Sequence, residues 1–326
     1  MDAGFQSIDY KGAKVSGFAN NGANTSQINF RGKENLGGGL SADFRVETDW
    51  NTVSNGGNQG NTAGSVASSF GNAEIRTGLA GGFGRIDIGA VNFNGLNSIL
   101  TGQPFGTAIG GGYGTILRVN AAGSSVRSDN SFKYTSPAIN GVSVTAYKAN
   151  KQTNPTTNTF SSTFGNYDMQ GSQEVGLNYN AGPVNVAYST LTQDAVGVGT
   201  GVEQKVNTLG ANYTMGALTI YALNQTNKTQ NAATVDTNYT SISAKYVMGA
   251  HSLMAQAGSL KNDVTSTKST MTGLGYNYDL SKMSNIYVRY ESMDDAAAVA
   301  ANPANLTAET GNNKRTRTAV GIKVGF

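Results

Sequence analysis

Most of the chain alternates apolar and polar residues with a period of two, which is the pattern of β-strands that have one apolar and one polar face. In the last such segment Val320, Ile322 and Val324 share one face, while Arg315, Arg317 and Lys323 fall on the other. The segment around Phe44 and the segment around Val288 repeat this arrangement. The alternation therefore predicts a protein built almost entirely of strands, and long helices are not expected.

The strand-like segments are separated by breaks, and short breaks alternate with long ones along the chain. The short breaks are the glycine-rich turn after Leu36, Gly81–Gly84, Ala138–Gly141, Ala181–Pro183, Gly216–Ala217, Gly249–Ala250 and Ser281–Ser284. The long ones are Gly17–Asn24, Thr52–Ala67, Phe93–Val126, Gln152–Gly171, Ala195–Val202, Gln230–Thr237, Asp263–Thr265 and Ala296–Asn313. About seven turns and eight loops give roughly sixteen strands, and an even strand number with short turns at one end is typical of outer-membrane barrels. The expected fold is all-β, a 16-stranded antiparallel transmembrane β-barrel formed by residues 1–326 as one domain.

A soluble β-sandwich would show the same alternation, so the alternation alone does not decide between it and a membrane barrel. The positions of the aromatic residues distinguish the two folds. Tyrosines recur near strand ends, where a membrane barrel places an interfacial girdle. They are Tyr134, Tyr179, Tyr213, Tyr246, Tyr276 and Tyr278. The mean hydropathy of −0.30 is compatible with membrane insertion, because a barrel strand needs only one apolar face over about ten residues.

Cysteine content and charge exclude several classes of protein. The chain has no cysteine, which excludes a disulfide framework and thiolate sites. Its net charge of +3 is small and the basic residues are scattered, so no nucleic-acid partner is expected. The chain starts Met-Asp-Ala-Gly without a secretory signal, and we expect that such a signal has been removed.

Five segments carry a recognisable family pattern: SQINFRGKENLGGGL (26–40), GLAGGFGRIDIGAVN (78–92), RSDNSFKYTSPAINGVSV (127–144), YDLSKMSNIYVRY (278–290) and VGIKVGF (320–326). In combination they resemble the Gram-negative porins typical of β-proteobacteria. The resemblance runs from Asp2 to Phe326. It implies a homotrimer of 16-stranded barrels in the outer membrane, in contact with lipid and lipopolysaccharide, each narrowed by a third loop that folds inward. It also implies that the strand ending at Phe326 is read by the machinery that assembles such barrels.

The chain departs from the family pattern at its start and on the barrel wall. Family members have several more residues before the Asp-Ala-Gly at Asp2, which puts the pairing of the first strand with the last in question. Arginines that family members often carry are replaced by Gln27, Ala73 and Ala90. The basic ladder of anion-selective members is thus partly missing.

The long break 93–126, called L3 below, is the expected pore constriction, because its length is far beyond that of ordinary loops. Its apolar residues can pack on the barrel wall, and Arg118 is its one charged residue before Arg127. The expected constriction and lumen residues are Arg31, Arg76, Arg85, Arg118, Arg127, Asp129 and Lys133. For any one of the wall residues, pairing with an opposite charge as part of a solvated face is the competing interpretation.

These features predict a water-filled channel for passive diffusion of small hydrophilic solutes and inorganic ions, with weak anion preference. A substrate-specific porin and a β-rich surface adhesin or binding protein remain as alternatives. An enzyme is not expected, because His251 is the only histidine and lies at a strand start next to a turn. No cofactor is expected, although Asp and Asn residues of the outer loops leave calcium binding open.

Overall fold

The computed structural model describes residues 1–10, 13–53, 70–119, 126–150, 171–194, 203–229, 236–294 and 314–325. These residues form seventeen strand segments in one sheet and one short helix. The elements are β1 (Asp2–Tyr10), β2 (Ala13–Asn20), β3 (Gln27–Gly37), β4 (Leu40–Asp49), β5 (Ile75–Gly81), β6 (Gly84–Asn92), α1 (Asn94–Gly102), β7 (Arg127–Thr135), β8 (Val142–Ala149), β9 (Ser172–Ala181), β10 (Val184–Asp194), β11 (Glu203–Met215), β12 (Leu218–Thr229), β13 (Asp236–Met248), β14 (His251–Asn262), β15 (Thr267–Asp279), β16 (Ser284–Asp294) and β17 (Lys314–Val324). No helix among the described residues has the length and apolar character needed to cross a membrane.

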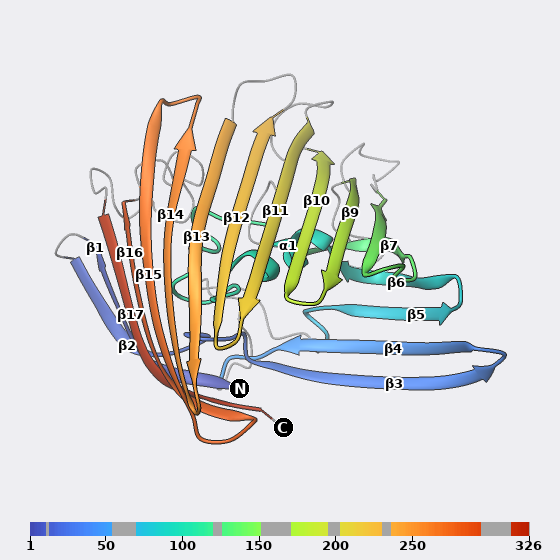
Figure 1. The fold of residues 1–326 in the computed structure, drawn as a ribbon, viewed down its shortest axis with the longest axis horizontal. Helices are drawn as coiled ribbons and strands as arrows, with labels where there is room; N and C mark the ends of the chain where they lie inside the picture. The colour runs from blue at the N-terminus through green and yellow to red at the C-terminus, as the bar shows by residue number, and fades with distance from the viewer. Residues whose placement is uncertain are drawn as a thin grey trace, which may run out of the picture.

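The strands follow one another as antiparallel neighbours from β3 through to β17 (Figure 1). The tight turns expected after Leu36 and at Gly81–Gly84, Gly216–Ala217 and Gly249–Ala250 all join consecutive strands. Four of the tyrosines expected at strand ends, Tyr179, Tyr213, Tyr246 and Tyr278, are exposed. The all-β antiparallel fold predicted from the alternation is confirmed.

The first and last strands pair with each other. β1 runs antiparallel to β17 from Asp2 opposite Lys323 to Asp9 opposite Thr316, and its other edge pairs with β2. The question that the chain start raised about this pairing is therefore answered by a continuous ladder. Neighbouring first and last strands are what a closed barrel requires.

Seventeen segments correspond to sixteen crossings of the sheet. Every pairing from β3 to β17, and onward through β1 to β2, is antiparallel, so β2 and β3 must point in the same direction. They are two pieces of one crossing, interrupted at Asn21–Ser26. The expected strand number differs from the observed one only by this interruption.

Residues of β1, β16 and the end of β4 meet in a hydrogen-bond network at the segment Asn21–Ser26. The Asp2 carboxylate accepts the backbone N–H groups of Ala23 (2.8 Å) and Asn24 (2.7 Å) and the hydroxyl of Tyr287 in β16 (2.5 Å). The Asp2 N–H donates to the Ser26 hydroxyl (2.9 Å), and the Trp50 N–H donates to the Ser26 carbonyl (2.8 Å). The chain start, β16 and the end of β4 are thus joined at one point.

Candidate functional site

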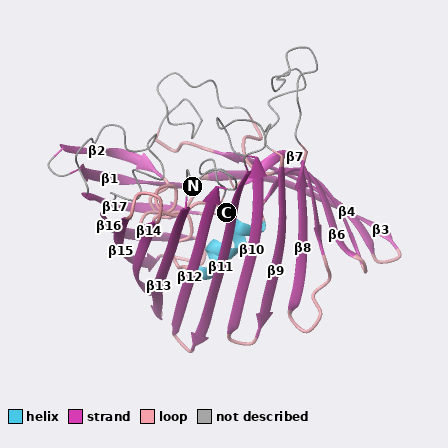
Figure 2. Ribbon diagram, turned by 90° about the horizontal axis from the view of Figure 1, so that it is seen from above, coloured by secondary structure: helices cyan, strands magenta, loops and turns pink. Residues whose placement is uncertain are grey.

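L3 leaves the sheet after β6 and folds onto its concave side. Figure 2 shows α1, the first part of L3, enclosed by the curved wall of strands. The helix packs mainly on β10 and β11. This helix was not expected, although Leu96, Ile99 and Leu100 have the i, i+3, i+4 spacing of a helix face.

A buried carboxylate holds the root of L3. Glu174 of β9 accepts the N–H of Asn94 at 2.6 Å with one oxygen and the N–H of Gly95 at 2.8 Å with the other. These N–H groups belong to the first turn of α1, which has no hydrogen-bond acceptors of its own for them. An anion at a helix N-terminus is also favoured by the helix dipole.

A second buried carboxylate holds the tip of L3. One oxygen of Glu291 in β16 accepts the N–H groups of Gly110 and Gly112, both at 3.1 Å. Its other oxygen is 2.7 Å from Arg317 and 3.4 Å from Arg315, both on β17. Arg315 also donates to the Thr115 hydroxyl of L3 at 2.9 Å, so residues of both β16 and β17 bind the tip.

Glycines on the wall allow the loop backbone to come close. A Cβ on Gly210 of β11 would lie 1.8 Å from the carbonyl oxygen of Ser98, and one on Gly273 of β15 would lie 2.1 Å from that of Gly110. Gly273 is a glycine within strand β15, and the loop tip lies against it. Alternation alone could not reveal this, since it does not show which wall positions the loop covers.

The apolar residues of L3 pack as expected, with one exception. Phe93, Ile99, Phe105, Ile109, Ile116 and Leu117 are all buried. Phe93 packs on Tyr147 of β8 with ring centroids 4.8 Å apart. Leu100 is 48% exposed, so the expectation that it packs on the wall was wrong: it lies on the side of α1 turned away from the sheet.

Arg118 lies at the returning end of L3 against β12. Its N–H donates to Gln225 Oε1 (3.2 Å), and Gln225 Nε2 donates to its carbonyl oxygen (2.5 Å). The side chain is buried, and its Nη2 has no hydrogen-bond partner within the described part of the chain. Burial lowers the pKa of Arg118 to about 10, so the guanidinium keeps its charge at neutral pH.

The loop contacts described above lie on β8 to β12 and on β15 to β17, and strands β3 to β7 carry a different kind of surface. On β4 to β6, Arg76 lies 2.6 Å from Asp43 and 2.9 Å from Asp87. Arg85 lies 2.6 Å from each of the same two carboxylates. Two of the expected lumen arginines thus form a four-residue ion-pair cluster.

A second group of charges lies further along β3 and β4. Arg45 pairs with Glu47 and with Glu74, which directly precedes β5. Gln27, which stands where family members often carry arginine, donates to Glu47 (2.8 Å) and Asp49 (3.0 Å). Arg31 lies opposite Arg45 in the β3–β4 ladder and is exposed.

Strand β7 carries the other three expected residues of the wall, and Lys133 lies opposite Asp87 of the four-residue cluster in the β6–β7 ladder. Arg127 donates to the carbonyl oxygen of Asn72 (3.0 Å) and lies 4.0 Å from Asp49. Lys133 donates to the carbonyl oxygen of Asn92 at the root of L3 (2.9 Å). Asp129 is half-buried in the same strand. Phe326, the expected assembly residue, lies outside the described residues.

The charges of these strands are equal in number, but one of them does not face the lumen. With Glu74, strands β3 to β7 carry the basic residues Arg31, Lys33, Arg45, Arg76, Arg85, Arg127 and Lys133 and the acidic residues Glu34, Asp43, Glu47, Asp49, Glu74, Asp87 and Asp129. Glu34 lies opposite Ala42 and shares the outer face with Phe30 and Phe44. A channel between this wall and L3 is therefore bordered by charges of both signs, with a small formal excess of cations on the wall.

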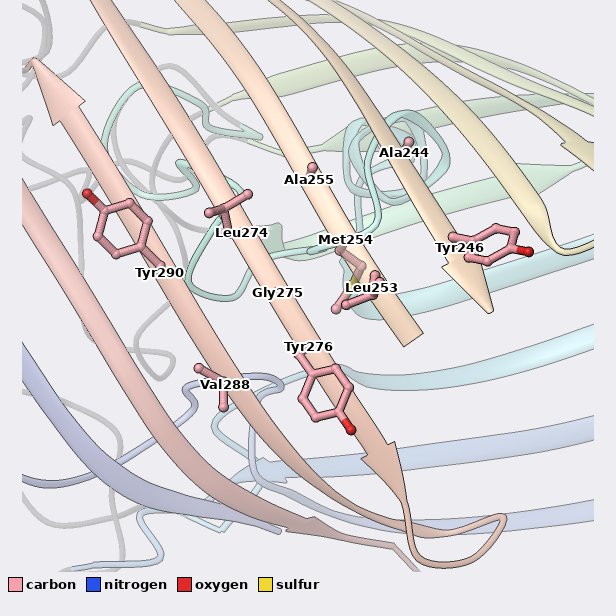
Figure 3. A pocket seen from close by; sticks show the side chains of 10 residues that line it. All are labelled: Ala244, Tyr246, Leu253, Met254, Ala255, Leu274, Gly275, Tyr276, Val288 and Tyr290. Atoms are coloured by element: carbon pink, nitrogen blue, oxygen red, sulfur yellow. The ribbon is translucent and has the colours of Figure 1, made fainter. Parts of the chain in front are cut away.

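An apolar groove of about 590 Å³ lies over β13 to β16 and is separate from this region. Figure 3 shows its lining, which includes Tyr246, Leu253, Leu274, Tyr276 and Val288. These residues share the face opposite to Gln256, which donates to Gln103 of L3. The groove is therefore on the outer face of the sheet and does not suit a hydrophilic solute.

No metal-binding cluster of His, Cys, Asp and Glu occurs among the residues that the structure describes. His251 is exposed at the start of β14, as expected, and its Nδ1 lies 2.8 Å from the Tyr276 hydroxyl.

Comparison with known proteins agrees with this geometry. The chain is 27% identical over 294 residues to outer membrane porin protein 32 of Delftia acidovorans, covering 86% of this chain and 77% of the relative. An anion-selective porin from Comamonas acidovorans superposes with a TM-score of 0.79 at 21% identity, covering 100% of this chain and 97% of the other. OmpT of Vibrio cholerae in its trimer form gives a TM-score of 0.69 at 14% identity, covering 100% and 98%. The profile of Gram-negative porins matches residues 1–298, and the chain therefore belongs to the Gram-negative porin family.

Proposed function

We propose that residues 1–326 form a single barrel domain that acts as a water-filled channel for passive diffusion of small hydrophilic solutes and inorganic ions. L3 (93–126) narrows this channel in the outer membrane, and the protein needs no cofactor and catalyses no reaction. The observation that carries the proposal is the position of L3, held to the inner face of β9–β17 by Glu174 and Glu291 and facing a wall of charged residues. A loop placed in this way reduces the width of a barrel without closing it.

The selectivity we propose is a weak preference for anions. Without the outward-facing Glu34, the β3–β7 wall has a formal excess of only one positive charge, so it repels neither sign strongly. Arg118 adds one cation from the loop side, and within its described part L3 carries no carboxylate to oppose it. One structural relative is described as anion-selective, which agrees in sign. At physiological salt the Debye length is about 8 Å, so one charge has only a local effect.

We also propose that the chain assembles as a homotrimer in contact with lipid and lipopolysaccharide. The outer face of β1 to β4 and of the segment before β5 exposes a group of large aromatic residues. They are Phe5, Phe18, Phe30, Phe44 and Phe70. Exposed apolar patches of this kind are typical of protein interfaces as well as of lipid-facing surfaces. OmpT of Vibrio cholerae, which has a similar fold, is described in a trimer form.

Swelling of liposomes in sugar solutions tests the diffusion proposal. Vesicles containing the folded protein should swell in isotonic monosaccharide at a rate proportional to protein content. The rate should fall steadily from mono- to tri- to larger oligosaccharides, because the pore sorts by size. Uptake of one sugar only, at a saturable rate, would contradict general diffusion and indicate a substrate-specific porin.

A further inference from the structure

Two buried carboxylates hold L3, and they hold different parts of it. Glu174 and Glu291 are each at most 2% exposed, and each accepts two backbone N–H groups of the loop. We infer that they are positioning residues that fix the root and the tip of L3 independently, and that Glu291 sets the open width of the pore. The statement about pore width rests on the proposed channel function, but the attachment of the root and of the tip of L3 can be tested without measuring transport.

The two carboxylate oxygens of Glu291 bind different partners. Oε2 accepts the N–H groups of Gly110 and Gly112, and Oε1 faces the Arg315 and Arg317 guanidinium groups. Every neighbour of this carboxylate named here is a donor, so both oxygens have to be acceptors. In Glu291→Gln the amide NH2 would face either the loop N–H groups or the arginines. One of the two partners must therefore lose its acceptor, whichever way the amide turns.

The glycines at the tip explain why the carboxylate can bind two N–H groups with one oxygen. Gly110 has φ +108° and Gly112 has φ +70°, conformations that other residues rarely adopt. Successive N–H groups that converge in this way form an anion-binding concavity. The tip is thus shaped for an anion, and in this protein the anion is Glu291.

The root contact is organised differently. Each oxygen of Glu174 accepts one N–H of the first turn of α1, and Asn94 Nδ2 donates in addition to the Tyr188 carbonyl oxygen at 3.1 Å. An amide at position 174 would keep one of its two acceptors. α1 also packs on β10 and β11, so the root has support that does not depend on Glu291.

The test uses single cysteines for spin labelling, which is direct because the chain has no cysteine. Thr107→Cys reports on the tip and Leu100→Cys on α1; both positions are partly or fully exposed. Each label is combined with Glu291→Gln, with Glu174→Gln, and with Glu203→Gln as the control. Glu203 is an exposed glutamate at the start of β11, with no contact to L3 among the described residues.

We expect Glu291→Gln to mobilise the label at position 107 and to leave the label at position 100 unchanged, and Glu174→Gln to do the reverse. Loss of a charge-assisted hydrogen bond corresponds to a rise of roughly ten- to a hundredfold in the population of the detached loop. In planar bilayers, Glu291→Gln should also add conductance substates that are absent from the control. Resistance of the folded form to SDS at room temperature shows that each variant has folded.

The labels separate this inference from the channel proposal. If the wild type forms no channel, the channel proposal fails, while the labels still show whether each carboxylate holds its own part of L3. If both labels respond equally to both substitutions, or neither label responds in a folded variant, independent positioning is wrong.

Discussion

At the scale of single residues, the charged wall of β3 to β6 is made of pairs that neutralise one another. Arg76 and Arg85 share Asp43 and Asp87. Ion pairs that remain in contact with water contribute only about 0–1 kcal/mol each to stability. Their main effect is therefore on the field along the pore, and removing one member should change selectivity more than folding.

Asp43→Asn should increase anion preference. The substitution leaves Arg76 and Arg85 with Asp87 alone, so the cluster gains one positive charge. At a distance of about 8 Å in water a unit charge contributes about 0.5 kcal/mol, which is about a twofold change in the anion-to-cation permeability ratio. Reversal potentials in a KCl gradient measure this ratio. Asp263→Asn, an exposed carboxylate beyond the end of β14, is the control and should leave it unchanged.

Arg118→Gln should shift the reversal potential in the opposite direction and by a similar amount. The guanidinium is charged at pH 7, because burial lowers its pKa only to about 10. As the pH rises through about 10 the wild type should lose this contribution and approach the variant, which lacks the titrating group. A variant with unchanged selectivity at pH 7 would show that Arg118 does not face the ion path.

The alternation in the sequence identified these charged residues but not their partners. Parity placed Arg76 and Arg85 on the inner face, whereas the cluster depends on the register between β4, β5 and β6, which the sequence does not show. The role of Glu174 and Glu291 at L3 depends on where a loop distant in sequence comes to lie, which alternation does not show.

At the scale of elements, L3 and the wall are shaped for each other. α1 can lie on β11 because Gly210 leaves room for the Ser98 carbonyl, and the tip can lie on β15 because of Gly273. The strands and tight turns were predictable because their signals are local.

Two features were not predicted. The helix α1 was missed because nine residues with three apolar positions are easily taken for part of a loop. The interruption between β2 and β3 was taken for a loop at which the chain reverses its direction.

Gly210→Ala should displace α1 and destabilise the protein. The added Cβ would lie 1.8 Å from a backbone oxygen, which no side-chain rotation can relieve. Overpacking of this kind costs about 1–3 kcal/mol. The loss should appear as a lower unfolding midpoint in urea titrations followed by tryptophan fluorescence. Gly17→Ala in β2, whose Cβ would meet nothing within 4 Å, is the matched control, and an equal midpoint for both variants would contradict close packing of α1.

At the scale of the whole molecule, sixteen crossings are joined into one sheet by the pairing of β1 with β17. Asp2 adds contacts at this junction, because its buried carboxylate joins β1 to the segment between β2 and β3 and to Tyr287 of β16. Asp2→Ala should leave two N–H groups and a hydroxyl without their acceptor, at a cost of about 3 kcal/mol. The temperature at which the folded band disappears in SDS gels should fall. Asp279→Ala, at an exposed strand end, should not change it.

Single-channel recording in planar bilayers, with reversal potentials under a KCl gradient, tests the central claim most directly. A trimeric, L3-narrowed pore with a nearly balanced wall should insert in conductance steps of three equal levels and give a small reversal potential of anionic sign. Absence of channels from a folded, SDS-resistant sample would contradict the channel, and a reversal potential close to the limit for a perfectly selective pore would contradict the nearly balanced wall.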